Sequence, residues 1–467
     1  MKPIPTTDFV NAIRGAIKNP GSLSKQIRGI SLDTRTLKPN DVYWAIAGKN
    51  YDGHDFVEEA FNKQASAAIV NETSHSPNCP TAERLITVDD TLKALHRFAA
   101  WHRKGFQATT IGITGSYGKT TTRELLFSVL STKHNCLQNK HNQNNEIGIP
   151  LTIFELTEHH QYLIAELGAA KPGDIRPLAE ITSPKIGLIT GIGPAHLAGF
   201  KTKEQIIETK GDLIASLPED GLAVIPGGEE WSDPLIQRAA CRVITYGSDR
   251  INNYHATYIE ASNQHLKFHT QGEHYTLPLI GRHHVTTGLA AVALATELGY
   301  SPEQIQQGFD RFQPIPGRGR VVRSDPWTII DDTYNANPSA TIAACRMLAD
   351  WQTPGRRFLV LGDMLELGPD SKRYHEELGR LAGELEIDFI YAYGEFASSI
   401  ANGVRSARTL TRISVFDEQQ ELIQELRTQV SQDDVVLVKG SRGMRMEHVV
   451  EALLKTPKSN EAVASVN

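Results

Sequence analysis

The run Gly112-Ile113-Thr114-Gly115-Ser116-Tyr117-Gly118-Lys119-Thr120-Thr121-Thr122 decides the fold of this chain. A β-rich apolar segment, 110–114, leads into glycines and then into Lys119 and Thr120. The pattern after them predicts a helix over 119–130. Glycines let backbone N–H groups curl around phosphate oxygens, and the helix N-terminus adds a favourable dipole and free donors. The run therefore predicts a loop that binds the phosphates of a nucleotide.

Residue types within the loop indicate separate roles. Lys119 would bring a point charge to the β- and γ-phosphates, and Thr120 would offer a hydroxyl to Mg²⁺. The spacing is unusual, because the common pattern wants glycine five residues before Gly118, where this chain has Ile113. The alternative is a glycine-rich turn with a surface lysine, but the succession of strand, loop and helix favours the phosphate loop.

A second group is needed to hold the metal of a nucleotide triphosphate. Glu166 directly follows the apolar run 162–165, so it is expected at the carboxyl end of a strand. Ligands of open α/β sheets bind at that edge, and a carboxylate there could hold Mg²⁺. Alone, such a glutamate would more often be a solvated or capping residue.

Bulk composition narrows the class of protein. The chain has 467 residues, 40% of them hydrophobic and 22% charged, with a formal net charge of −6. Single cores stop growing near roughly 250–300 residues, so several domains are expected. The charge argues against a general nucleic-acid binder. No apolar run approaches the ~20 residues that span a bilayer, and the N-terminus lacks the apolar stretch of a signal peptide.

The four cysteines are far apart and form no CxxC pair, so neither a zinc site nor a disulfide framework is indicated. These residues are Cys79, Cys136, Cys241 and Cys345. We expect a cytoplasmic protein without membrane insertion and without a nucleic-acid partner.

Strands alternate with helices along most of the chain, which predicts mostly parallel, helix-covered sheets in an α/β fold. Residues 1–106 are expected to form a small α/β unit, with a helix over 8–17 and strands over 27–32 and 42–46. Residues 107–314 form the unit that carries the phosphate loop. After a linker candidate at Pro314-Ile315-Pro316-Gly317, residues 315–467 are expected to form a doubly wound α/β domain.

Several separate segments match a known family. They are Asn144-Asn145-Glu146-Ile147-Gly148-Ile149-Pro150-Leu151-Thr152, Glu166-Leu167-Gly168-Ala169, Ile192-Gly193-Pro194-Ala195-His196-Leu197, Asp331-Asp332-Thr333-Tyr334-Asn335-Ala336-Asn337-Pro338, Leu361-Gly362-Asp363-Met364-Leu365-Glu366-Leu367-Gly368 and Lys439-Gly440-Ser441-Arg442. Together with the loop form Thr-Gly-x-x-Gly-Lys-Thr, they make the chain resemble the Mur ligases over nearly its whole length. The resemblance is closest to members that add D-alanyl-D-alanine to a UDP-linked muramoyl tripeptide.

The resemblance implies three domains: an N-terminal UDP-binding domain, a central P-loop ATPase domain and a C-terminal Rossmann-like domain. It also implies an ATP-dependent amide-bond ligase that works through an acyl phosphate. The expected substrates are ATP, the UDP-muramoyl tripeptide and D-alanyl-D-alanine, with Mg²⁺ as cofactor. We expect the enzyme to be a monomer.

Site residues follow from the same resemblance. The expected catalytic residues are Lys119, Glu166, His196 and Lys210, and the expected metal ligands are Thr120, Glu166, His196 and Lys210, the lysine as a carbamate. The expected ATP-binding residues are Gly115, Ser116, Tyr117, Gly118, Lys119, Thr120, Thr121, Asn145, His284, Arg318 and Asp332. The expected substrate-binding residues are Asp33, Thr34, Arg35, Gly48, Asp52, Gly53, His54, Asn335, Asn337, Lys439, Ser441 and Arg442. From sequence alone Lys210 would be an ordinary charged helix residue, and the two N-terminal loops would be polar turns.

The chain departs from the family pattern at a few positions. His284 and Thr287 stand where the family usually has asparagines near adenine and ribose, and Gly191 and Ala170 also replace asparagines of the subgroup. These departures leave open a Mur-like ligase with a different acid or amine substrate. A nucleotide-binding scaffold without strong catalysis is opposed by the intact loop lysine and metal-ligand set, and a nucleotide kinase by the loop spacing.

Overall fold

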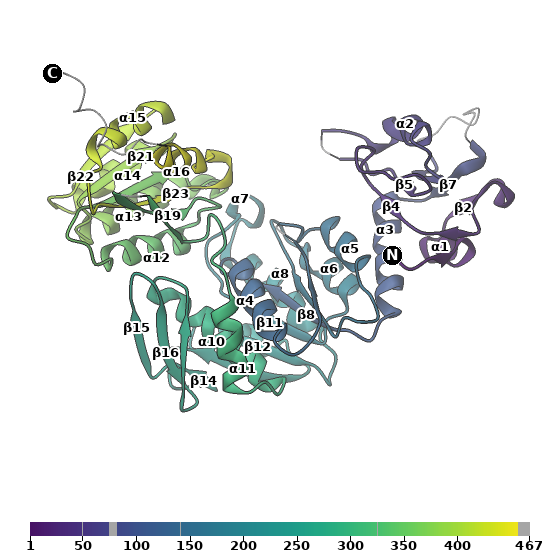
Figure 1. The fold of residues 1–467 in the computed structure, drawn as a ribbon, viewed down its shortest axis with the longest axis horizontal. Helices are drawn as coiled ribbons and strands as arrows, with labels where there is room; N and C mark the ends of the chain where they lie inside the picture. Colours follow the sequence, from purple (N-terminus) through teal and green to yellow (C-terminus); the bar gives the residue numbers. More distant parts are fainter. Residues whose placement is uncertain (49, 74–81, 141, 325, 456–467) are drawn as a thin grey trace, which may run out of the picture.

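The computed structural model describes residues 1–467 except 49, 74–81, 141, 325 and 456–467. Three α/β units follow one another along the chain, and Figure 1 shows the first (purple) and the last (yellow-green) on opposite sides of the central unit. Cys79 lies outside the described residues, and the other three cysteines are free thiols.

The N-terminal unit is built on a five-stranded sheet in the order β2-β7-β6-β5-β4, in which β2 is antiparallel to β7 and the other pairs are parallel. A separate two-stranded sheet joins β1 to β3. The elements are β1 (Ile4–Pro5), α1 (Thr6–Ile13), β2 (Ala16–Ile17), β3 (Gln26–Ile27), β4 (Ile30–Ser31), β5 (Val42–Trp44), α2 (Val57–Asn62), β6 (Ala67–Asn71), β7 (Leu85–Val88) and α3 (Thr91–Lys104).

Two expectations for this unit were wrong in detail. The helix expected over 8–17 ends at Ile13, because Arg14 takes a left-handed conformation with φ of 56°. Ala16–Ile17 then forms a strand against β7. The single strand expected over 27–32 is two short strands that belong to different sheets.

The central unit has a seven-stranded, all-parallel sheet in the order β14-β13-β12-β11-β8-β10-β9, with a three-stranded antiparallel sheet beside it. The elements of the large sheet are β8 (Thr109–Thr114), α4 (Lys119–Leu130), β9 (Cys136–Gln138), α5 (Gly148–Ile153), β10 (Tyr162–Glu166), α6 (Ile175–Thr182), β11 (Ile186–Ile189), α7 (Leu197–Phe200), α8 (Lys203–Ala215), β12 (Leu222–Pro226), α9 (Ser232–Ile236), β13 (Arg242–Gly247) and β14 (Tyr254–His255). The rest are β15 (Tyr258–Ala261), β16 (Leu266–Thr270), β17 (Glu273–Leu277), α10 (Val285–Glu297) and α11 (Pro302–Arg311). The expected strand, phosphate loop and helix are all present.

The C-terminal unit is a six-stranded sheet in the order β18-β19-β23-β20-β21-β22, parallel except for the edge strand β18. Its elements are β18 (Arg320–Ser324), β19 (Trp327–Asp332), α12 (Pro338–Ala349), β20 (Arg357–Gly362), α13 (Ser371–Glu384), β21 (Phe389–Tyr393), α14 (Ala397–Ser406), β22 (Arg412–Phe416), α15 (Gln419–Gln429), β23 (Val435–Lys439) and α16 (Glu447–Leu454). The expected doubly wound domain is therefore present.

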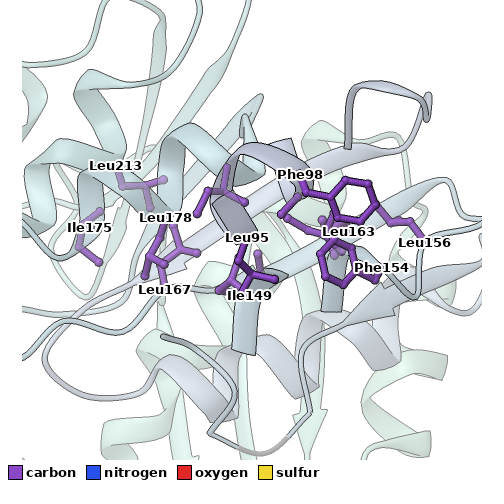
Figure 2. Packing of buried hydrophobic residues seen from close by; sticks show 14 of the residues in the cluster. Leu95, Phe98, Ile149, Phe154, Leu156, Leu163, Leu167, Ile175, Leu178 and Leu213 are labelled. Atoms are coloured by element: carbon purple, nitrogen blue, oxygen red, sulfur yellow. The ribbon is translucent and has the colours of Figure 1, made fainter. Parts of the chain in front are cut away.

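The N-terminal unit is joined to the central unit by an apolar contact. Figure 2 shows Phe98 of α3 beside Phe154, with ring centroids 5.0 Å apart, and Leu95 beside Ile149 of α5. His96 on the same helix bonds through Nε2 to the carbonyl oxygen of Glu146 at 2.7 Å. One continuous core thus runs from the first unit into the second.

Among the residues that the structure describes, no helix is both long and apolar enough to cross a membrane.

Removing the Phe98 ring should destabilise this junction. Phe98 is fully buried among aromatic rings, and truncation of a buried phenylalanine to alanine costs about 3–5 kcal/mol. We expect Phe98→Ala to lower the free energy of unfolding by that amount in urea denaturation. Leu410→Ala, at a fully exposed side chain, should change it by less than about 0.5 kcal/mol; equal effects of the two variants would contradict the packing described here.

Candidate active site

A cleft of about 1330 Å³ opens where the carboxyl ends of the central and C-terminal sheets meet. Its lining brings together most of the residues that the sequence predicts to bind nucleotide, metal or dipeptide. These are Ser116, Tyr117, Gly118, Lys119, Thr120, Thr121, Asn145, Glu166, His196, His284, Arg318, Asp332, Asn335, Asn337, Lys439, Ser441 and Arg442. Helix α3 of the N-terminal unit also reaches the cleft, through Lys93 and His96 among others.

The phosphate loop joins β8 to α4 and is held by the segment that follows β11. Ser116 N donates to the carbonyl oxygen of Gly191 at 2.7 Å, and Gly118 takes a left-handed φ of 78° at the cap of α4. A Cβ on Gly115 would come within 2.1 Å of Thr190 Oγ1, so only glycine fits there. Since α4 begins at Lys119, its free N–H groups face the cleft, as an anion site requires.

Lys119 lies folded back on its own loop. Its Nζ donates to Gly115 O at 2.8 Å. Burial lowers the pKa of Lys119, the nearby Arg318 lowers it further, and Glu166 opposes the shift. A half-buried cation without a carboxylate hydrogen-bonded to it favours an incoming anion, because the anion would compensate the lost hydration.

Glu166 ends β10 and is almost fully buried at the edge of the cleft. Its Oε2 accepts from Arg123 Nη1 at 3.2 Å, and its Oε1 accepts from Asn144 Nδ2 at 2.8 Å. The adjacent Asn145 holds the chain at the start of α5, since its Oδ1 accepts from Gly148 N at 2.8 Å. The expectation that Glu166 stands at a strand end beside the loop is met.

The C-terminal unit sends an arginine into the phosphate loop. Arg318 Nη2 donates to Thr120 Oγ1 at 3.3 Å, and its guanidinium lies 3.9 Å from the centre of the Tyr334 ring. Burial lowers the pKa of Arg318, and the negative charge of Glu166 opposes this. Two units therefore contribute cations to one site.

Opposite the loop, two neighbouring strands end in an ion pair. Asp332 of β19 and Lys439 of β23 are register partners, and Lys439 Nζ lies 2.6 Å from Asp332 Oδ2. Lys439 also donates to Asn335 O at 3.0 Å. Burial raises the pKa of Asp332, while Lys439 opposes the shift. The Asn337 side chain caps α12 by accepting from Ala340 N at 2.9 Å, which gives it a structural role as well.

Ser441 and Arg442 follow β23 at the same edge. Ser441 Oγ accepts from Leu365 N at 2.8 Å, and Arg442 pairs with Glu447 at 2.9 Å. Ser441 is buried, whereas the Arg442 side chain is largely exposed.

His196 is engaged across the domain boundary. Its Nδ1 pairs with Oε2 of Glu366 in the C-terminal unit, and Ala198 N donates to Glu366 O at 2.9 Å. Hydrogen bonding to His196 lowers the pKa of Glu366. Among the described residues, no group of three or more His, Cys, Asp or Glu side chains is arranged to hold a metal ion.

Lys210 lies on α8 and is 98% buried, outside the residues that line the cleft. Burial lowers its pKa well below the ordinary value, and the charge of Lys119 lowers it further. Its Nζ lies 5.9 Å from the centre of the Phe200 ring. The structure thus places Lys210 close enough to Lys119 for the two charges to interact.

Departures from the family pattern have local physical causes. A Cβ on Gly191 would come within 2.5 Å of the Tyr117 ring, so a larger residue does not fit beside this tyrosine. His284 and His283 lie with ring centroids 4.1 Å apart at the start of α10, and burial lowers the pKa of both. Burial therefore favours the neutral form of both rings.

The two N-terminal loops lie outside the described lining of the cleft. Asp33 and Arg35 form an ion pair at 2.6 Å, which lowers the pKa of Asp33 to about 2. In the second loop His54 Nδ1 lies 2.6 Å from Asp52 Oδ1. Further contacts join Lys63 Nζ to Thr34 O at 3.1 Å, Gly48 N to Tyr51 O at 2.8 Å and Tyr43 Oη to Gly53 O at 2.9 Å.

Sequence reasoning gave no role to several residues that shape the site. Arg123 and Asn144 hold Glu166, Glu366 holds His196, and Tyr334 stacks on Arg318. Arg123 could have been found from its position four residues after Lys119, since residues at that spacing share one face of a helix.

Comparison with known families gives three matches along the chain. The model described as "Mur ligase family, catalytic domain" matches residues 26–103, "Mur ligase middle domain" matches 113–295, and "Mur ligase, glutamate ligase domain" matches 317–442.

Relatives match over nearly the whole chain. The UDP-N-acetylmuramoyl-tripeptide–D-alanyl-D-alanine ligase of Bacillus subtilis is 34% identical, covering 97% of this chain and 98% of the relative. The ligase of the same name from Escherichia coli is 33% identical over 91% and 93%. The structure of MurF from Acinetobacter baumannii superposes with a TM-score of 0.89 at 31% identity, covering 98% of this chain and 100% of the other. The MurF ligase from Thermotoga maritima in complex with ADP gives 0.81 at 29% identity, covering 92% and 97%.

Replacing Arg318 with lysine should weaken nucleotide binding. Lysine keeps the charge but loses the planar fork and the stacking on Tyr334, and a hydrogen bond to a charged group contributes about 1.5–3 kcal/mol. We expect ATP to bind Arg318→Lys at least about tenfold more weakly in calorimetric titration. Arg320→Lys, at an arginine outside the described lining of the cleft, is the matched control; equal affinities of the two variants would exclude a nucleotide role for Arg318.

Proposed function

The chain belongs to the Mur ligase family, and we propose that it joins D-alanyl-D-alanine to UDP-N-acetylmuramoyl-tripeptide, with ATP, in peptidoglycan precursor synthesis. The observation that carries the proposal is the cleft in which the phosphate loop meets Arg318. Full-length relatives with that printed activity support the choice of substrates.

Two anions must be brought together in this reaction. The terminal carboxylate of the UDP-linked peptide attacks the γ-phosphorus of ATP, which forms an acyl phosphate and releases ADP. The free amine of the dipeptide then attacks the acyl carbon, the C–O bond to phosphate breaks, and inorganic phosphate leaves with a proton lost from the nitrogen. Lys119 and Arg318 would stabilise the charge that spreads over the transferring phosphoryl group.

The donor set fits Mg²⁺, which prefers oxygen ligands. Thr120 offers a hydroxyl, and each Glu166 oxygen accepts one hydrogen bond and keeps a further lone pair. When bound, Mg²⁺ would neutralise phosphate charge and orient the nucleotide. His196 would join this set through Nε2 while Nδ1 stays paired with Glu366, and a carbamate on Lys210 would add an anionic oxygen donor.

Substrate roles are divided among the units. Asn335, Asn337, Lys439, Ser441 and Arg442 are proposed to hold the dipeptide, and Asp332 the ribose of the nucleotide. The seven N-terminal residues from Asp33 to His54 named above are proposed to hold the uridine nucleotide. We assign the protein to the cytoplasm, where it would meet its soluble substrates. We also predict that it is a monomer.

A second candidate is a Mur-type ligase with a different peptide or amine substrate. The histidine pair at the cleft, His283 and His284, is the observation in its favour, because the family usually has asparagine at position 284.

Phosphate release from ATP by the purified protein tests the proposed function. Release that requires both UDP-muramoyl tripeptide and D-alanyl-D-alanine, with a product heavier by one dipeptide residue in mass spectrometry, is the expected result. Activity with another amine but none with D-alanyl-D-alanine would support the second candidate function instead.

The proposed carbamate on Lys210 has its own test. A lysine with a lowered pKa is more often neutral, and a neutral amine adds CO₂ to give a carbamate anion and one proton. We expect Lys210→Ala to lose at least about a hundredfold in kcat, with partial recovery in acetate or propionate. Glu208→Ala, two residues earlier on α8, should keep the parent rate; full activity of unsupplemented Lys210→Ala would exclude the carbamate.

A further inference from the structure

A buried arginine lies directly behind the Glu166 carboxylate. Arg123 is on α4, one turn after Lys119, and its side chain is 1% exposed. Its Nη1 lies 3.2 Å from Glu166 Oε2, and its Nη2 lies 2.6 Å from Glu124 Oε1. Glu124 in turn accepts from Gln138 Nε2 at 2.8 Å. The guanidinium is therefore fixed by partners on two sides.

The other carboxylate oxygen is held from the opposite direction. Asn144 Nδ2 donates to Glu166 Oε1 at 2.8 Å, and the Asn144 carbonyl accepts from Gly168 N at 2.8 Å. Glu166 N donates to Asn139 Oδ1 at 2.8 Å, which fixes its backbone. With one donor on each oxygen, the carboxylate cannot rotate without breaking a buried hydrogen bond.

The two sides of Glu166 differ in their access to the cleft. Glu166 belongs to the described lining of the cleft, as do Thr120 and Asn144, whereas Arg123 does not. Arg123 therefore has no direct path to a nucleotide, and what it can influence is the charge and the orientation of the glutamate in front of it. An ordinary structural ion pair would not need its carboxylate at the ligand edge of the sheet.

We propose that Arg123 is a positioning residue that, with Asn144, fixes the Glu166 carboxylate in place for the divalent cation that accompanies the nucleotide. The inference rests on the proposed function, because it presumes a metal–nucleotide complex in the cleft. A buried carboxylate needs a compensating charge when no metal is bound, and Arg123 supplies it. The preformed geometry then avoids the cost of reorienting Glu166 each time the cation binds.

The test measures nucleotide binding rather than turnover. ADP is titrated calorimetrically into parent protein and Arg123→Met, in EDTA and over a series of Mg²⁺ concentrations. The affinity for ADP should rise as Mg²⁺ is added, and we compare the Mg²⁺ concentration at which half of this rise is reached. We expect that concentration to be about 10–100-fold higher in Arg123→Met, which is the range found for partners of metal ligands. Affinity in EDTA should stay within about threefold, because Arg123 does not contact the nucleotide. Arg123→Lys should recover part of the Mg²⁺ response.

Arg103→Met is the matched control, since it removes a second buried guanidinium, which bonds Thr110 and the backbone away from the cleft. It should lower the melting temperature without changing the Mg²⁺ response. If Arg123→Met does not fold, Asn144→Ala replaces it and should shift the Mg²⁺ response in the same direction. A folded variant with the parent Mg²⁺ response, or with an equal loss in EDTA, overturns the inference. Parent protein that binds ADP but fails to join the two substrates would instead overturn the proposed function.

Discussion

The site depends on the parallel register of three neighbouring strands, β10, β8 and β11. Their pairing aligns Glu166 with Ile113 and Ile189 with Thr114, so all three strands end at one edge. The phosphate loop, the Glu166 carboxylate and Thr190, which directly follows β11, consequently meet at that edge, where an open α/β sheet binds its ligands. Close packing then restricts the loop sequence, because Thr190 leaves no room for a side chain on Gly115.

Three cations gather around the Glu166 carboxylate at this edge. They are Lys119, Arg318 and Arg123, and burial lowers the pKa of both Lys119 and Arg318. Asp332 and Glu366 also line the cleft, but each is paired with another side chain. Buried cations are costly unless an anion compensates them. A triphosphate would supply that compensation, and Arg318 comes from a different unit than the loop. Binding of the anion and attachment of the C-terminal unit are therefore coupled through the same charges.

Sequence patterns predicted the local structure well where a single strong signal was present. The strand, loop and helix from Thr109 to Leu130 follow from an apolar run, glycines and a helical pattern, and the short strands 162–165 and 435–438 follow from their buried residues. The N-terminal unit was less predictable, because its strands are only two to five residues long. There the pairing partner decides the structure, as when Ala16–Ile17 joins β7 instead of continuing α1.

Local sequence patterns could not predict the contacts between distant segments of the chain. The pairing of His196 with Glu366 and that of Arg318 with Thr120 each join residues more than 160 positions apart. Motif resemblance named His196, Arg318 and Thr120, yet it could not show that His196 has a carboxylate partner in the C-terminal unit. That partner is compatible with the proposed metal set, because a carboxylate at Nδ1 leaves Nε2 of His196 for a cation. Since Glu366 also accepts from Ala198 N through its backbone, the contact between the two units and the orientation of His196 depend on the same residue.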